Sequence, residues 1–147
     1  MKLFVSTDGT DADYFVKLID VFPGDTPDPD PNPKAIVMGN YQMLVGVEAM
    51  RARYRESMSD PRPLTKDKVT PVNFTIWDKF HTFKKGHRIM VQVHSTWFPA
   101  YDRNPQQFID IYSAAKDDLK VATQRIHRAS EAPSHLVLPV INIAGAQ

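Results

Sequence analysis

The chain has 147 residues, of which 42% are hydrophobic and 24% charged, as is ordinary for a folded domain with its own core. Its 18 Lys and Arg nearly balance 17 Asp and Glu, which excludes the basic surface that nucleic-acid binding needs. It has no cysteine and no apolar run of the ~18 residues that a membrane helix requires. We therefore expect no nucleic-acid or membrane partner, no disulfide and no thiolate chemistry.

Alternating apolar positions predict an extended strand over residues 13–22, with Tyr14, Val16 and Leu18 on its buried face. The stretch at about 23–35 is rich in proline and aspartate, which predicts a long solvated loop because proline cannot donate to a sheet ladder. Its three aspartates suggest a calcium site, but the spacing lacks the glycine and distal glutamate of a calcium loop. We expect no metal there; the aspartates are Asp25, Asp28 and Asp30.

A second long strand is predicted over residues 41–56, with arginines at alternate positions on its wet face. These arginines are Arg51, Arg53 and Arg55. Such a row can grip an acidic ligand through bidentate hydrogen bonds. More often such a row is a solvated face or an ion-pair ladder, here with Asp20 or Glu56 as partners.

Two hairpins are predicted further along the chain. The strands at 72–76 and 89–93 flank a glycine turn at 84–87, which favours a hairpin. The segments 124–127 and 136–140, separated by a break at 132–134, are interpreted as a closing hairpin.

Helical spacing occurs at Ser113–Ala122 and predicts one short surface helix. Strands separated by turn signals, with twelve prolines and almost no helix, favour an all-β sandwich or barrel.

Motifs for independent catalysis are absent from the sequence. No serine lies in the G-x-S-x-G pattern that lets an α/β-hydrolase present its nucleophile on a strained turn. No histidine pair has the helical spacing of a zinc protease, and no glycine-rich phosphate loop occurs. We expect no catalytic residue, metal or cofactor within this chain and interpret the five histidines as structural.

The segment from Arg88 to Gln106, which includes His-Ser-Thr-Trp-Phe-Pro-Ala-Tyr-Asp-Arg-Asn-Pro-Gln, resembles a strand and loop of known hydrolases. It is similar to the C-terminal domain of X-prolyl dipeptidyl peptidases and cocaine-esterase-like hydrolases. Within that family it most resembles α-amino-acid ester hydrolases and glutaryl-7-aminocephalosporanic acid acylases. Further similarity lies at residues 11–21, 39–42, 53–57 and 134–139, so nearly the whole chain is covered.

The resemblance implies a jelly-roll β-sandwich of the galactose-binding type, forming a single domain over residues 1–147 that lacks its first strands. It also implies a parent serine hydrolase acting on esters or amides, with its catalytic triad in a separate α/β-hydrolase domain. This chain is then a non-catalytic accessory domain that braces the catalytic domain and shapes its substrate entrance. Strand edges left open favour pairing between copies, hence a possible homo-oligomer. Members of the subgroup suggest a periplasmic or secreted parent, although the start of the chain lacks a signal-peptide apolar region.

The loop after the strand at 88–94 carries the candidate domain-interface residues. Clustered aromatics with one arginine are typical of protein interfaces because they bury much area at modest entropic cost. The alternative is that Phe98 and Tyr101 plug the end of the sandwich while local hydrogen bonds hold the rest. The candidates are Trp97, Phe98, Tyr101, Asp102, Arg103 and Asn104.

A carbohydrate-binding or other interaction module is the alternative function, since jelly rolls often hold sugars on exposed aromatics. Trp77, Trp97 and Tyr101 are the candidate sugar-binding residues for that hypothesis. This alternative rests on analogy between folds.

Overall fold

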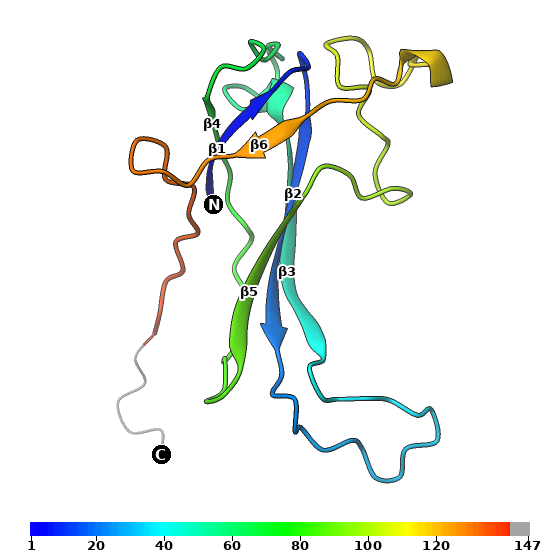
Figure 1. Cartoon of the computed structure of the whole chain (residues 1–147), viewed down its shortest axis with the longest axis vertical. Coiled ribbons are helices and arrows are strands. Elements are labelled where there is room, and N and C mark those ends of the chain that lie inside the picture. The colour runs from blue at the N-terminus through cyan, green and yellow to red at the C-terminus, as the bar shows by residue number, and fades with distance from the viewer. Residues whose placement is uncertain (142–147) are drawn as a thin grey trace.

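The computed structural model describes residues 1–141 and consists of two antiparallel three-stranded sheets (Figure 1). The first sheet has the order β4-β1-β6 and the second has the order β3-β2-β5. The predicted all-β sandwich is confirmed. The strands are β1 Lys2–Thr7, β2 Asp13–Val21, β3 Gln42–Arg51, β4 Thr70–Asn73, β5 Arg88–His94 and β6 Gln124–Ile126.

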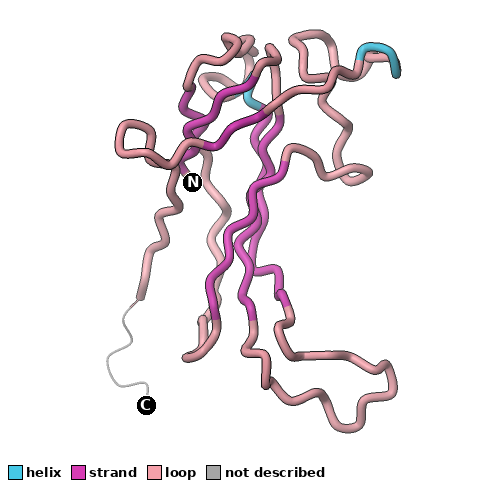
Figure 2. Tube along the Cα trace, in the orientation of Figure 1, coloured by secondary structure: helices cyan, strands magenta, loops and turns pink. Residues whose placement is uncertain are grey.

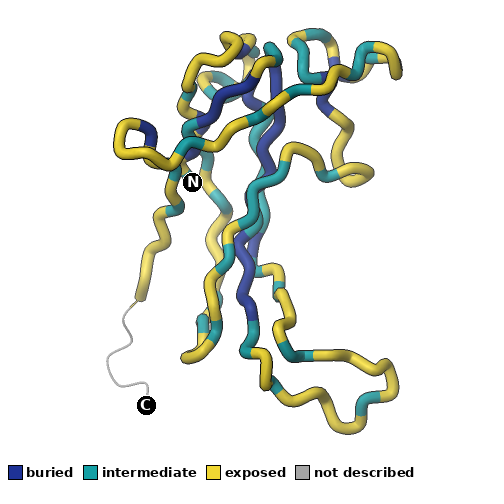
Figure 3. The backbone as a smooth tube through the Cα atoms, in the orientation of Figure 1, coloured by how far each residue is buried: buried dark blue, intermediate teal, exposed yellow. Residues whose placement is uncertain are grey.

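The core lies where the short first sheet covers the upper half of the long second sheet. Leu3, Val5 and Val72 of the first sheet pack with Tyr14 and Val16 of the second, and all five are at most 1% exposed. Figure 3 shows this burial as dark blue along β1 and β2, whereas the outer strands and loops are mostly teal or yellow.

The central strand β1 was not anticipated from the sequence. Its run Lys2–Thr7 pairs with β4 on one side and β6 on the other. A short apolar run before Asp8 and Gly9 is its only local signal, because Leu3, Phe4 and Val5 are apolar in succession and do not alternate with polar residues. Its burial comes from neighbours that lie far away in the sequence.

β2 was predicted with one buried face, but both faces are buried. Eight of its nine residues are buried and Lys17 is half-buried. The strand is central in its sheet, with the first sheet over one face and the loop after β5 over the other. This position explains why Phe15, Ile19 and Val21 are apolar as well as the predicted face: a strand covered on both sides is apolar at most of its positions.

The first predicted hairpin is wrong, because its two strands belong to different sheets. β4 pairs with β1, whereas β5 pairs with β2. The turn itself is confirmed: the His87 amide donates to the Lys84 carbonyl at 3.1 Å, and Gly86 has φ 88°, a conformation that glycine adopts without strain. Residues 74–83 cross between the sheets without forming a strand.

The closing hairpin is also wrong. Residues 124–126 pair with β1, and His135 makes an isolated bridge to Lys2 of the same strand. The first arm therefore pairs with β1, the bridge to Lys2 lies just before the second arm, and residues 136–141 form no strand.

Two predicted elements, the strand over residues 41–56 and the helix at Ser113–Ala122, are shorter in the structure than expected (Figure 2). β3 ends at Arg51, and a 3₁₀ turn, Ala52–Tyr54, follows because the Ala52 amide bonds to the Ala12 carbonyl and turns the chain inward. The expected helix at Ser113–Ala122 is confined to a single 3₁₀ turn, Lys116–Asp118.

The proline- and aspartate-rich segment is an exposed loop that continues to Tyr41. Asp28 accepts a hydrogen bond from the Met38 amide at 2.8 Å, and Asn32 exchanges two bonds with the Ile36 backbone. Asp28 thus serves the loop itself. Within residues 1–141, no group of three or more acidic or histidine side chains is arranged to hold a metal ion.

No described helix is long and apolar enough to cross a membrane.

Candidate interface at the loop after β5

The loop that follows β5 folds back over the outer face of β2. Phe15 of β2 is its anchor, with the Trp97 ring at 6.3 Å and the Tyr101 ring at 4.9 Å, both edge to face. The Lys17 ammonium lies 4.9 Å from the Trp97 ring centre, and Tyr101 stacks near it at 6.1 Å with an 18° interplanar angle. Trp97 therefore contacts a cation and two other rings, and these contacts fix the loop on the sheet.

The tip of the loop faces away from the sheet. Phe98 is 61% exposed, and the Arg103 guanidinium lies 5.1 Å from its ring centre. Asp102 is also exposed and reaches Arg51 of β3 at 3.7 Å. Among the six candidates, Phe98 and Arg103 thus form the outward pair, whereas Trp97 is turned toward β2.

Asn104 lies on the inward side and is 7% exposed. Its side-chain amide donates to Asp11 Oδ2 at 3.0 Å and to Asp13 Oδ1 at 2.8 Å. Its Oδ1 accepts the Gln106 amide at 2.8 Å. Asn104 therefore uses both ends of its side chain inside the domain and is a structural anchor of the loop.

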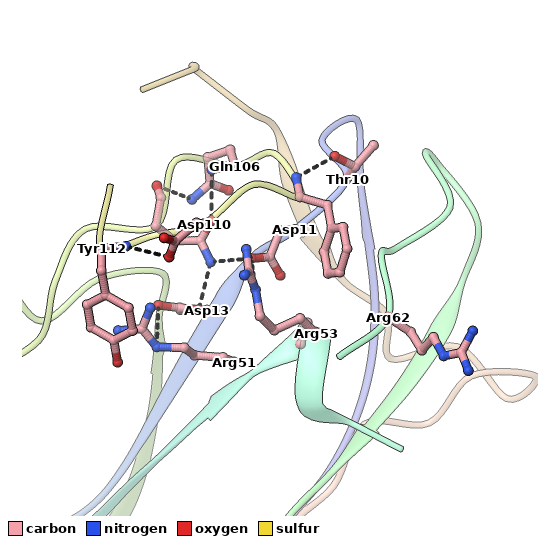
Figure 4. A network of polar contacts seen from close by, with 12 residues as sticks. Thr10, Asp11, Asp13, Arg51, Arg53, Arg62, Gln106, Asp110 and Tyr112 are labelled. Carbon is pink, nitrogen blue, oxygen red and sulfur yellow. Dashed lines mark hydrogen bonds and ion pairs between the residues drawn. The ribbon is translucent and has the colours of Figure 1, made fainter. Parts of the chain in front are cut away.

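The arginines of the row form ion pairs within the domain, as the ion-pair alternative predicted, and Figure 4 shows those of Arg51 and Arg53. Arg53 pairs with buried Asp11 at 2.6 Å, and Arg51 lies 3.8 Å from Asp13. Arg55 pairs with Glu56 at 3.2 Å, as predicted, and donates to backbone carbonyls.

Asp20 was the other suggested partner of the arginine row, and this prediction is wrong. Asp20 lies far along β2 from the arginines and is 1% exposed. It accepts hydrogen bonds from His81 Nε2 at 2.9 Å and His87 Nδ1 at 2.8 Å. Burial raises the pKa of Asp20, but the two histidines outweigh it and hold that pKa below its ordinary value.

Asp13 shows the opposite balance. The pKa of Asp13 is raised from 3.8 to about 6, because burial and, to a smaller extent, the Asp11 charge outweigh the Asn104 hydrogen bond and the Arg51 charge, which lower it. Burial and the same two carboxylates also raise the pKa of the Tyr14 hydroxyl. The anchor under the loop is therefore a costly buried acidic pair, stabilised by arginine and asparagine.

Sequence reasoning missed the acidic half of this anchor. The signal was present as Asp11-Ala12-Asp13, which brings two carboxylates to the start of an apolar strand. Aspartates at such a position are usually exposed, and only the fold places Arg53 and Asn104, 42 and 93 residues from Asp11, on the same carboxylate.

One serine and histidine pair occurs, between Ser6 Oγ and His127 Nε2 at 2.9 Å. Ser6 is 5% exposed inside β1, and no acidic side chain of residues 1–141 makes a hydrogen bond to the other nitrogen of His127. A hydrolytic triad needs a reachable hydroxyl and an oriented base. The pair instead ties β1 to residues 127–134, where Ser134 Oγ also accepts the Phe4 amide at 2.8 Å.

The sugar-binding candidates differ in how open they are. Trp97 is half-buried and contacts Lys17 at 4.9 Å and Tyr101 at 6.1 Å, measured to ring centres. Trp77, at 74% exposure, is the open ring of the three and lies on the crossing segment between β4 and β5, beside Met50 of β3.

The strands form an all-β sandwich, and the buried hydrogen bonds and ion pairs described above mainly hold the loops of this domain in place. Residues 1–137 match the family described as the X-Pro dipeptidyl-peptidase C-terminal non-catalytic domain, and the chain belongs to this family.

The chain is 37% identical over 140 residues to cocaine esterase from Rhodococcus sp. (strain MB1 Bresler), a match that covers 95% of this chain and 22% of the esterase. An aminopeptidase structure from a marine sediment archaeon, Thaumarchaeota archaeon, is 47% identical with a TM-score of 0.81 over 90% of this chain and 21% of that one. An α-amino acid ester hydrolase structure is 45% identical with a TM-score of 0.80, and the shares covered are again 90% and 21%. The chain thus spans about a fifth of the length of these relatives.

Proposed function

We propose that this domain is the C-terminal accessory part of a serine hydrolase acting on esters or amides, and that the tip of the loop after β5 docks on the catalytic domain. The family of non-catalytic domains and the ester- and peptide-hydrolysing relatives support the parent activity. The single observation on which the docking role rests is that Phe98 and Arg103 face solvent together on a loop that the Phe15–Tyr101 contact holds on β2.

A rigid base and an exposed aromatic tip are what an interface anchor needs. The tip loses little entropy on docking because Trp97, Tyr101 and Asn104 already fix the loop. An aromatic and an arginine then bury a large area with directional hydrogen bonds. In this proposal the domain braces the catalytic domain and forms one wall of its substrate entrance.

Substitution of Phe98 in the parent enzyme tests this proposal. We expect Phe98→Ala to lower kcat/KM and the melting temperature of the parent enzyme, while the isolated 147-residue chain melts as before, because the ring contacts little within the domain. Tyr112→Ala is the matched control, since Tyr112 is 85% exposed and lies in the same connection but beyond the segment from Trp97 to Asn104. Equal behaviour of the two variants in the parent enzyme would reject the docking role.

The strand order also supports a proposal for the complete domain. A jelly roll has eight strands in two sheets, and the orders β4-β1-β6 and β3-β2-β5 leave room for two more; β5 and β6 are outer strands, as are β3 and β4. On β5 and β6, Ile89, Val91 and Ile126 are 55%, 40% and 36% exposed. We propose that two further strands of the parent polypeptide pair there.

For the 147-residue chain alone, the same edges favour association between copies, the homo-oligomer suggested by the sequence. Sedimentation velocity over a range of concentrations tests this proposal, and a single monomeric species at high concentration contradicts it.

A further inference from the structure

The outer edge of β3 carries a hollow on each face of the sheet. β3 is the last strand of its sheet, and Glu48, Ala49 and Met50 line both hollows. The hollow on the outer face is bounded by Phe15, Arg51, Tyr54, Met58 and Tyr101. The hollow on the inner face is bounded by Phe74, Thr75 and Trp77 of the crossing segment.

Backbone groups of β3 point out between the two hollows. The Ala49 amide donates to the carboxylate of its neighbour Glu48 at 2.9 Å, so it faces away from β2. Because antiparallel ladders alternate, the backbone groups of Val47 and Arg51 face the same way. Outside the β2–β3 ladder, no backbone hydrogen bond within residues 1–141 engages these three residues.

The charge at this edge is not balanced. Arg51 is committed to Asp13 and Asp102. Glu48 has no cationic partner within the described part of the chain and is bonded to the backbone instead. The Glu48 carboxylate occupies the Ala49 amide and so protects this edge from non-specific strand pairing. A basic side chain on an incoming strand would bind the carboxylate and free the amide.

From these features we infer that the outer edge of β3 accepts an extended strand of the catalytic domain, which rests on the proposed function. The incoming strand donates and accepts backbone hydrogen bonds at Val47, Ala49 and Arg51. Its alternate side chains enter the two hollows, and a Lys or Arg pairs with Glu48. This is strand addition, in which the backbone gives affinity and the hollows give specificity. The outer hollow includes Tyr101, so the edge continues the surface of the loop after β5.

Amide hydrogen exchange on the 147-residue chain tests this inference with a defined probe. The probe is an acetylated nonapeptide in which valine and threonine alternate around one central lysine. Its counterpart, N-methylated at alternate amides, is the control because it cannot form the ladder. We expect the first peptide to slow exchange about tenfold at Val47, Ala49 and Arg51, the ratio that corresponds to nine-tenths occupancy, and the second to have no effect.

Two variants locate the site. Glu48→Lys is expected to weaken binding of the lysine peptide about fivefold, whereas Asp117→Lys, an exposed acid on the distal 3₁₀ turn, leaves it unchanged. Ala49→Pro is expected to abolish binding, with the circular dichroism spectrum checking that the fold persists.

Protection that is absent at millimolar peptide, or equal for both peptides, would overturn the inference. A dimer that Ala49→Pro dissociates would also overturn it, because the occupant would then be a second copy. These results do not depend on Phe98 and therefore separate this inference from the docking role of the loop.

Discussion

The raised pKa of Asp13 gives the domain a pH dependence that a single substitution should remove. The carboxyl is 1% exposed, and its pKa shifts from 3.8 to about 6 on folding. The folded state therefore binds this proton more tightly than the unfolded chain does. Stability must fall as the pH rises through this window and must level off above the folded-state pKa. A shift of about two pKa units corresponds to about 3 kcal/mol.

Asp13→Asn keeps the shape of the side chain and an oxygen that accepts from Asn104, but it removes the charge. We expect the difference in free energy of unfolding, variant minus wild type, to grow by about 2 kcal/mol between pH 4 and pH 7, because part of the full effect lies below pH 4. Urea unfolding monitored by tryptophan fluorescence at closely spaced pH values measures this difference. Asp60→Asn is the control, because Asp60 pairs with Arg62 on the surface and both side chains are 61% exposed.

A difference that stays constant from pH 4 to pH 7 would refute the reasoning, since Asp13 would then be ionised in the folded protein throughout. A difference that grows as the pH falls would show that Arg51 and Asn104 outweigh burial.

Three further predictions follow from the same contacts. Asn104→Ala should destabilise the chain by about 2–4 kcal/mol in urea unfolding, because two buried carboxylates lose a donor; a loss below about 0.5 kcal/mol would mean that water replaces the amide. Trp97→Ala should lower the melting temperature of the isolated chain while Phe98→Ala leaves it unchanged, and equal effects would remove the distinction between the base and the tip of the loop. Asp20→Asn should cost about 2 kcal/mol at neutral pH, as the histidine contacts lose their charged acceptor. Because the pKa of Asp20 is lowered in the fold, this loss should fade as the pH falls below its ordinary value of 3.8, and a loss that persists at lower pH would contradict the assignment.

The sequence by itself determined the class of fold and the family. Alternation marked β2, β3 and β5, the glycine marked the turn at Gly86, and proline marked the loop after β2. These features depend on the local chain, where side chains alternate across a strand and glycine or proline restricts the backbone. The motif around residues 97–106 was specific enough to indicate the family that the comparisons then showed.

Only the tertiary structure decided which strands pair and which candidate residues face outward. Both hairpin predictions failed because alternation indicates a strand but not its partner. β1, which pairs with β4 and β6, was missed because its apolar residues are consecutive and do not alternate. Asn104 and Phe98 lie in the same loop with similar local signals. One is buried on Asp11 and Asp13 and the other is exposed, because contacts across about ninety residues of sequence set the orientation of the loop.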